Sequence, residues 1–422
     1  MTSTKTRVEN RRSLLTGDGG RILLFAILAS GLTGPGQTIG VSVFIDHFIS
    51  DLEITRSEVS GAYLVGTLSA SLFLPSVGRF IDRHGVRKSQ VVIGLAFALV
   101  LVNMAFVTGL ITLAVGFIGI RLLGQGSLSL VSTVTVSLRF EKDRGTALGV
   151  FSTFSAALLA LAPILLGFAI STWGWRSAWL AAAVAILVTV IPLAWFGLAS
   201  MPRGTVAKPS KAPPITSRQD ASINPTENAV TRADAVRTRG FWILVAISGS
   251  TSMLATGLNF HQIDLLTTAG LSTTAAAALF LPQVIGSSIA GFGFGVLVDR
   301  VDGPWLPAAA AALLVSAHLL AAIVAPGLVV FIYAIMLGAA GGASRTVTSA
   351  LLPKWFGTQE IGSIQGTLTT TNVGLSAIGP VTLAVLESST GSYATSVLIL
   401  ALIPVGAGLF AFSAPRGSKT GG

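Results

Sequence analysis

The sequence predicts an all-α membrane protein, with twelve transmembrane helices arranged as two pseudo-symmetric six-helix bundles. The first observation is composition: 52% of the 422 residues are hydrophobic and 10% are charged, against about 25% charged in an ordinary soluble domain. The second is a series of twelve apolar segments, each of about the 20 residues that a helix needs to cross a bilayer. The third is a set of landmarks that recurs at a constant spacing. Together they exclude a soluble globular protein.

Charged and turn-forming residues separate the twelve apolar segments from one another. Each segment is predicted to be one membrane-spanning helix. The predicted spans are 22–48, 57–81, 89–108, 110–137, 145–171, 176–199, 240–267, 273–298, 305–325, 328–352, 362–386 and 392–412.

The distribution of Lys and Arg predicts the orientation of these spans, because cytoplasmic loops of membrane proteins are enriched in both. Of the 27 Lys and Arg, Arg121 and Arg345 lie inside spans, and Arg56 and Arg176 lie on one side. The other 23 lie on the side of the termini. We therefore expect a multi-pass protein of the plasma (cytoplasmic) membrane with both termini in the cytoplasm.

The excess of basic residues, a net charge of +10, does not indicate a nucleic-acid partner, because these residues lie between apolar runs. The chain contains no cysteine, which excludes disulfides, thiolate metal sites and cysteine nucleophiles. The first apolar segment lacks a signal-peptide cleavage site and is expected to remain as a span.

Five regions are expected along the chain: an N-terminal tail (1–21), a first bundle (22–199), a linker (200–238), a second bundle (239–412) and a C-terminal tail (413–422). The linker is rich in Pro, Ser, Thr and Arg and has few large apolar residues. This composition predicts a flexible cytoplasmic segment. A small binding module within it is the alternative.

An internal repeat relates the two predicted bundles. The run Gly78-Arg79-Phe80-Ile81-Asp82-Arg83 has a weaker copy 217 residues later in Gly295-Val296-Leu297-Val298-Asp299-Arg300. The same offset relates Pro163 to Pro380 and Gly174 to Gly391. Membrane transporters are commonly built from two such halves, with the substrate site at the repeat interface. The repeat therefore indicates transport.

The loop after the second span carries a motif of known type, Gly78-x-x-x-Asp82-x-x-Gly85-x-Arg87-Lys88. With twelve spans and a central loop, it resembles the major facilitator superfamily over almost the whole chain. The resemblance implies that this loop and its weaker copy form a gate between the halves, and that Gly78 permits close helix approach. The alternative is a role in topology alone. The implied gating residues are Gly78, Asp82, Arg83, Gly85, Arg87, Asp299 and Arg300.

Arg121 is the leading candidate for substrate binding. It lies in the fourth predicted span, within Arg121-Leu122-Leu123-Gly124-Gln125-Gly126, and resembles the fourth-span arginine of the family. A charged residue at the bilayer centre costs about 2.5–3.5 kcal/mol on insertion scales, so it should face a cavity or a partner. Bracing of neighbouring helices is the alternative. Arg345, nearer the cytoplasmic end of span ten, is the second candidate and could instead extend to the interface.

Further motifs resemble the monocarboxylate and oxalate-formate branch of the family. They are Gly34-Pro35-Gly36-Gln37-Thr38, the segment from Arg139 to Gly149, Gly174-Trp175-Arg176 and Gly379-Pro380. Members of that branch tend to carry an arginine in span eight or a lysine in span eleven. Gln283 and Asn372 stand in those spans here, so a carboxylate would depend on Arg121, Arg345 or neutral donors.

Other polar residues within the spans are candidate substrate contacts, with helix-to-helix hydrogen bonding as the alternative. Gln37, Gln283 and Asn372 are expected near the bilayer midplane, and Tyr63 near the outer end of span two. His261 lies toward the outer end of span seven, close to Asn259, and could take part in proton coupling. An ordinary histidine of the outer vestibule is the alternative. The predicted substrate contacts are Arg121, Arg345, Gln37, Tyr63, Gln283, Asn372, His261 and Asn259.

No enzyme, cofactor or metal motif is recognisable in the sequence. We therefore expect a monomeric secondary transporter of a small organic anion, most simply a monocarboxylate, working by alternating access in the lipid bilayer. A proton or a counter-anion gradient would drive it. One alternative is an exporter of amphipathic drugs or metabolites, which Ala162-Pro163 disfavours because such exporters carry Gly-Pro there. Another is a membrane sensor, which would need an output domain.

Overall fold

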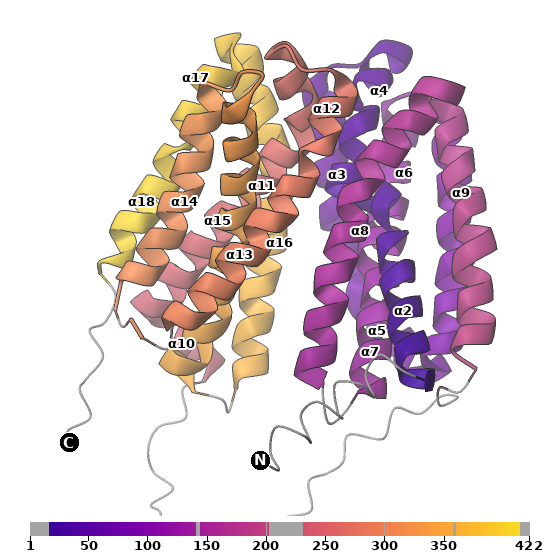
Figure 1. The fold of residues 1–422 in the computed structure, drawn as a ribbon, viewed down its shortest axis with the longest axis horizontal. Helices are drawn as coiled ribbons and strands as arrows, with labels where there is room; N and C mark the ends of the chain where they lie inside the picture. Colours follow the sequence, from indigo (N-terminus) through magenta and orange to yellow (C-terminus); the bar gives the residue numbers. More distant parts are fainter. Residues whose placement is uncertain are drawn as a thin grey trace, which may run out of the picture.

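The computed structural model describes residues 17–140, 144–199, 201, 231–298, 300–301, 303–357 and 360–413. Within these residues the regular structure is entirely helical. The long helices run side by side in two groups, one from each half of the chain (Figure 1). Helix α2 begins and α18 ends at the same end of the molecule, which we call the base. The opposite end, where α4, α12 and α17 lie, is called the top.

The first crossing is broken into short helices. They are α2 (Gly17–Gly31), the 3-10 turn η1 (Gly34–Gly36), α3 (Thr38–Val41), the 3-10 turn η2 (Ser42–Phe44) and α4 (Ile45–Leu52). Pro35 lies at the start of η1 and cannot donate a backbone hydrogen bond, so regular helix stops there. The predicted span 22–48 is therefore present, but as a discontinuous helix.

The rest of the first half consists of α5 (Arg56–Ala105), α6 (Leu110–Ile120), the π-helix η3 (Arg121–Leu128), α7 (Ser129–Arg139), α8 (Arg144–Trp173), α9 (Trp175–Pro192) and the π-helical η4 (Leu193–Gly197). Helix α5 contains two crossings. They meet at Gly85, whose φ of +76° is a left-handed conformation that favours glycine. The loop motif therefore forms a sharp reversal at the base.

The second half consists of α11 (Arg239–Thr268), α12 (Thr273–Ala278), α13 (Phe280–Val298), α14 (Trp305–Ala322), α15 (Leu328–Phe356), α16 (Ile361–Thr390), α17 (Tyr393–Leu400) and α18 (Leu402–Ala411). In the described part of the chain, ten helices are long and apolar enough to cross a membrane. Because α5 holds two crossings and the broken first segment adds one, the fold contains the twelve predicted crossings.

A short helix, α10 (Arg232–Arg237), precedes the second half and corrects part of the linker prediction. Thr231 caps it, and its hydrogen bonds lower the pKa of the Asp234 carboxyl. The backbone amide of Arg232 donates to Glu360 at 2.7 Å, which attaches α10 to the start of α16. The end of the predicted flexible linker is thus folded, and residues 202–230 lie outside the described residues.

Glycines allow close helix packing inside the second half. In α15, Gly338 and Gly342 face the backbone of α13 at Gln283 and Ser287, where a Cβ would clash with carbonyl oxygens. Gly257 of α11 and Gly379 of α16 make a similar contact. Small residues bring helix backbones together in membrane proteins. The glycines in these spans therefore serve packing.

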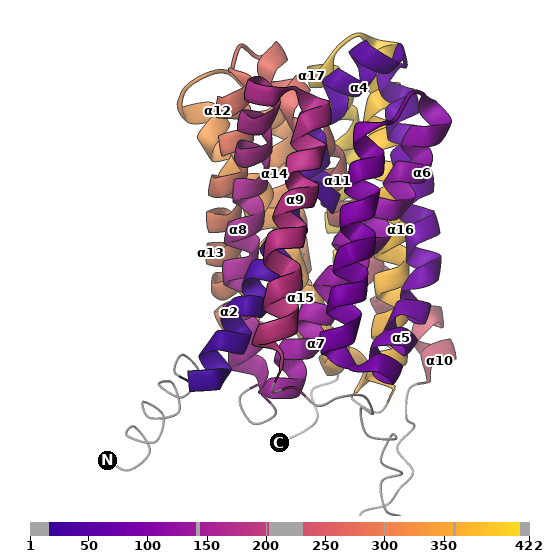
Figure 2. The ribbon, with the colours of Figure 1, turned by 90° about the vertical axis from the view of Figure 1, so that its right-hand side faces the viewer.

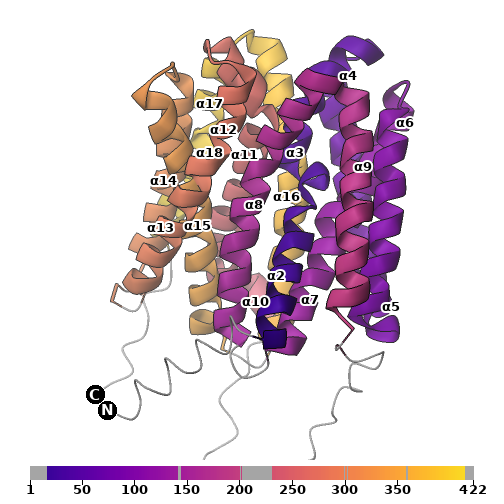
Figure 3. The ribbon, with the colours of Figure 1, turned by 45° about the vertical axis from the view of Figure 1, so that its right-hand side comes forward.

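The two halves contact each other through helices near the centre of the molecule. Helix α5 packs against α16, and α8 packs against α12 and α13. Figure 2 shows α5 beside α16, and Figure 3 shows α8 meeting α12 near the top. In this region the ring of Tyr63 in α5 lies 4.6 Å, centroid to centroid, from the ring of Phe260 in α11. These aromatic rings join the halves above the candidate site.

Candidate functional site

Arg121 begins the π-helical segment η3, where the backbone widens between α6 and α7. π-Helical segments are rare in proteins, but those that occur frequently lie at functional sites. Gly36 of η1 packs directly on this segment, because a Cβ on Gly36 would lie 2.5 Å from the Ile120 carbonyl oxygen and 3.0 Å from the Gly124 Cα. The close contact between two backbones brings the broken first crossing next to Arg121.

The Arg121 guanidinium is buried and held from three sides, with the residue 5% exposed. Its Nε donates to Thr67 Oγ1 at 3.1 Å, and its Nη1 lies 3.4 Å from both the Gly36 carbonyl oxygen and Thr38 Oγ1. The Tyr63 ring lies under the guanidinium carbon at 4.7 Å from its centroid. No described residue accepts a hydrogen bond from Nη2, so two N–H groups are free to bind another molecule.

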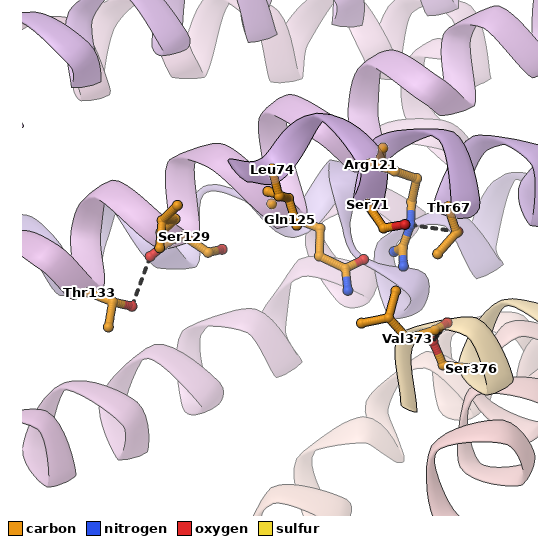
Figure 4. Close-up of a pocket in the computed structure, with 12 residues that line it drawn as sticks. Thr67, Ser71, Leu74, Arg121, Gln125, Ser129, Thr133, Val373 and Ser376 are labelled. Carbon is orange, nitrogen blue, oxygen red and sulfur yellow. Dashed lines mark hydrogen bonds between the residues drawn. The ribbon is translucent and has the colours of Figure 1, made fainter. Parts of the chain in front are cut away.

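Arg121 lines a cavity of about 440 Å³ between the two halves (Figure 4). Most of the wall comes from α5, η3 and α7, and Val373 and Ser376 of α16 close the other side. Arg121 is the one charged side chain among the described lining residues. The lining residues are Thr67, Ala70, Ser71, Leu74, Arg121, Gln125, Gly126, Ser129, Leu130, Thr133, Val373 and Ser376.

The electrostatic character of this cavity follows from its lining. One fixed positive charge lies beside small hydroxyl and apolar groups, with no described acid in the wall. A cation in a site of low dielectric attracts anions strongly, because little water screens it. Each salt-bridged carboxylate among the described residues lies at an end of the molecule rather than in this cavity.

Two of the predicted contacts meet in this region and one lies beside it. Arg121 lines the cavity, and Tyr63 stacks on Arg121 while its hydroxyl lies 2.6 Å from Thr38 Oγ1. Gln37 precedes α3, and its Nε2 donates to Thr33 Oγ1 at 3.0 Å. Gln37 is not among the lining residues, because its amide turns back onto the first crossing.

Gln283 and His261 are occupied by contacts within the second half. Gln283 Nε2 donates to Gln262 Oε1 at 2.6 Å, so the helix-to-helix alternative describes its geometry. His261 is 1% exposed, and its Nε2 lies 2.9 Å from the Pro380 carbonyl oxygen. In this conformation α16 covers the ring, so His261 does not face an outer vestibule as in the alternative above, and its contact with substrate stays a prediction.

The remaining predicted contacts also lie outside the cavity wall. Asn372 Oδ1 accepts a hydrogen bond from Ser248 Oγ at 3.1 Å, within the second half. Asn259 is half-buried, and its Oδ1 has no partner among the described residues. Arg345 is exposed and donates from Nη2 to Ser287 Oγ at 2.6 Å. The structure therefore does not bring the two intramembrane arginines to one cavity.

The predicted gating residues at the base make few contacts. Asp82, Arg83 and Arg300 are exposed and form no ion pair with a described residue. The Arg87 guanidinium stacks 4.6 Å from the centroid of the Trp195 ring in its own half. No atom of another described segment lies within 4 Å of a Cβ placed on Gly78, so the expected close helix approach is absent among the described residues. Asp299 lies outside the described residues.

An ion pair joins the halves at the opposite end. Arg56 of α5 contacts Asp264 of α11 at 3.1 Å and Asp46 of its own half at 2.6 Å. The Tyr393 hydroxyl also donates to Asp264. The described contacts between charged groups of the two halves are therefore at the top, while the cavity wall extends from Arg121 along α7 toward the base. The conformation is closed at the top.

Sequence reasoning missed most of the cavity wall. Thr67, Ser71, Ser129, Thr133 and Ser376 are small hydroxyl residues of a kind found throughout apolar helices, so they carry no distinctive signal. Gln125 did carry such a signal, because it follows Arg121 by four residues in a helix and thus shares its face.

No group of three or more potential metal ligands occurs in the described part of the chain.

The fold and the cavity define a class of membrane transporter. Residues 23–327 match the profile of the Major Facilitator Superfamily, and the chain belongs to this family. The comparisons do not extend to the predicted monocarboxylate branch, which therefore remains a proposal.

Individual relatives give further comparisons. The chain is 29% identical over 160 residues to the MFS antiporter QDR3 of Candida albicans, a match that covers 37% of this chain and 22% of that protein. The fold of the present chain is similar to that of a bacterial homologue of the human lysosomal transporter Spinster, whose structure is in an inward-facing, unoccupied conformation. The TM-score is 0.73 at 16% identity, covering 94% of this chain and 97% of the other. The fold is also similar to that of the nucleoside transporter NupG. This match has a TM-score of 0.73 at 14% identity and covers 93% of this chain and 99% of NupG.

Proposed function

We propose that this protein is a secondary transporter of small organic anions, most simply monocarboxylates, and that the carboxylate binds at Arg121. The observation that carries the proposal is the guanidinium itself, which is buried at the wall of a cavity between the halves and whose Nη2 has no acceptor among the described residues. A guanidinium binds a carboxylate through charge-assisted hydrogen bonds. Without a described acid in the wall, an anionic substrate is the natural counter-charge.

Alternating access provides the transport mechanism under this proposal. The top is closed by Tyr63 against Phe260 and by Arg56 against Asp264, whereas the cavity wall continues toward the base. The substrate would enter from the base in this conformation and leave from the top after the halves rock. A proton or counter-anion gradient would drive the cycle. The proposed location is the plasma membrane, with the base in the cytoplasm.

An exporter of amphipathic compounds is the second candidate. The similarity to a protein named as an MFS antiporter favours it, and so do the apolar side chains of Leu74, Leu130 and Val373 in the cavity wall. Such a compound need not carry a negative charge. Transport of a neutral amphipathic solute in preference to carboxylates would favour this candidate.

Counterflow into proteoliposomes tests the proposal, because exchange across the membrane does not require the driving gradient to be known. Labelled short-chain carboxylates are offered to the wild type, to Arg121→Gln and to Arg345→Gln. We expect exchange by the wild type, loss of at least about tenfold in Arg121→Gln because a charged hydrogen bond of about 1.5–3 kcal/mol is removed, and near-normal exchange in Arg345→Gln. Full activity of folded Arg121→Gln would refute the site.

A further inference from the structure

Gln125 carries an amide that has no hydrogen-bond partner among the described residues of the cavity. It lies in the wall four residues after Arg121, and its Oε1 is buried without a hydrogen-bond partner. No hydrogen bond joins either end of its amide to another described residue. Buried polar groups in proteins are nearly always hydrogen-bonded, so each exception needs an explanation. Because both ends of the amide are unpaired, this conclusion does not depend on which atom is the oxygen.

The Gln125 amide points to the same place as the arginine. Figure 4 shows both side chains projecting from one side of the helix toward Val373 and Ser376. The π-helical backbone of η3 supports this arrangement, because its wider turn places residues four apart close to one face. A molecule whose carboxylate binds the free Nη2 of Arg121 would therefore have its next atoms near the amide.

Two neighbouring hydroxyl groups, those of Ser71 and Ser376, offer mainly lone pairs. Ser71 donates its hydrogen to the Leu68 carbonyl oxygen at 2.7 Å, and Ser376 donates to the Val373 carbonyl oxygen at 2.8 Å. Each hydroxyl oxygen keeps lone pairs that can accept a hydrogen bond. Ser71 and Ser376 thus favour a substrate group that donates a hydrogen.

Two donor groups are common beside a carboxylate, an ammonium and a hydroxyl. An ammonium would lie close to the Arg121 charge, with no described acid in the wall to balance it. Desolvating an unpaired cation in such a place is costly. A hydroxyl meets the same acceptors without a charge. Farther along the cavity, Ala70, Leu74 and Leu130 offer an apolar surface.

We propose that Gln125 makes this cavity selective for 2-hydroxycarboxylates with an apolar remainder, the hydroxyl group binding the Gln125 amide while the carboxylate binds Arg121. The inference rests on the proposed function, because it assumes an organic anion at Arg121. It adds a specificity-determining residue and a substrate class narrower than monocarboxylates.

Three probes with one carbon skeleton test this selectivity: 2-hydroxy-4-methylpentanoate, 4-methylpentanoate and leucine. Each competes with labelled 2-hydroxy-4-methylpentanoate in counterflow. In the wild type we expect the hydroxy acid to bind about tenfold more tightly than the deoxy acid, the magnitude of one well-formed hydrogen bond. Leucine should compete least. Gln125→Met should weaken the hydroxy acid more than the deoxy acid, until the ratio of their affinities approaches one.

The matched control is Gln365→Met, which removes a glutamine that bonds Thr369 on its own helix. It should keep the wild-type ratio. Equal competition by hydroxy and deoxy acids in the wild type would overturn the role of Gln125 and leave the proposed function standing. Leucine competing as well as the hydroxy acid would also overturn it. If neither carboxylate is exchanged, the proposed function fails and this inference with it. The wild-type ratio is decisive even if Gln125→Met does not fold.

Discussion

A single buried guanidinium determines the chemistry of the cavity, and its surroundings explain why arginine rather than lysine is present. Nε and Nη1 hold the side chain against Thr67, Gly36 and Thr38, while Nη2 bonds to no residue that the structure describes. An ammonium has three donors on one atom and cannot anchor itself with one group while presenting another in a fixed plane. Under the proposed function, the guanidinium would combine anchoring with substrate binding.

Replacement of Arg121 by lysine tests this division of roles. Arg121→Lys keeps the charge but loses the planar fork, so we expect carboxylate exchange to persist with a half-saturating concentration at least about fivefold higher, equivalent to ~1 kcal/mol. Concentration-dependent counterflow measures it. Unchanged affinity would mean that charge alone matters and that the anchoring contacts to Thr67 and Gly36 contribute nothing to binding.

At the level of helices and turns, the site depends on the contact between η1 and η3. Gly36 has no side chain, so the first crossing can approach the backbone of Ile120 and Gly124. This approach brings the Gly36 carbonyl oxygen within 3.4 Å of Arg121 Nη1. The discontinuity at Pro35 and the widened η3 thus form one unit around the arginine.

A methyl group at Gly36 should disrupt this unit. In Gly36→Ala the Cβ would lie 2.5 Å from the Ile120 carbonyl oxygen, so backbone has to move. Overpacking of this kind costs about 1–3 kcal/mol, and we expect a lower melting temperature together with weaker carboxylate exchange. Gly61→Ala is the matched control, because no atom lies within 4 Å of a Cβ there. Equal melting temperatures for the two variants would contradict the close contact.

The sequence predicts some of these features and not others. Apolar length and a charge within a span can be recognised in a sequence, whereas contacts between helices cannot. The twelve crossings followed from apolar length, and Arg121 from the cost of a charge in a bilayer. The side-chain partners of Gln283 and His261 could not be predicted from the sequence. The distance of a residue from the end of its helix indicates its depth in the membrane, but not which neighbouring helix its side chain contacts. The partners Gln262 and Pro380 became visible only in three dimensions. Gln125 could have been predicted as a lining residue, because it follows Arg121 by four residues and so shares its face of the helix.

For the whole molecule, the internal repeat accounts for the two similar halves. The candidate site lies where the two copies of the repeat differ in sequence. At the position related to Arg121, the second half has Gly338, which packs against the backbone of α13 at Gln283. An arginine could not fit there without separating α13 from α15. Among the described lining residues, the positive charge of the cavity therefore comes from the first half, and the second half contributes Val373 and Ser376.

Closure of the top should depend on the ion pair between the halves. The Arg56 and Asp264 side chains are 19% and 25% exposed, so solvent screens their 3.1 Å contact only in part. We expect Arg56→Gln to shift the equilibrium toward an open top by about fivefold, equivalent to ~1 kcal/mol. Spin labels on Ser50→Cys and Thr274→Cys, exposed at the top of each half, report the distance in a chain that has no other cysteine.

Asp46→Asn provides the control for this measurement. It removes the negative charge that pairs with Arg56 within its own half and leaves the pair with Asp264 in place. Its distance distribution should therefore stay close to that of the unsubstituted chain. A distribution that is the same in Arg56→Gln as in the unsubstituted chain would show that apolar contacts such as Tyr63 with Phe260 close the top by themselves.

The most direct test of a carboxylate site at Arg121 is protection of a single cysteine placed at Ser71, which lines the same cavity wall. The rate at which N-ethylmaleimide modifies Ser71→Cys is measured with and without 4-methylpentanoate, in the presence of Arg121 and in Arg121→Gln. We predict that the carboxylate slows modification when Arg121 is present and has no effect in Arg121→Gln. Equal protection in both backgrounds, or protection by the neutral 4-methylpentanamide alone, would contradict an anion site at Arg121.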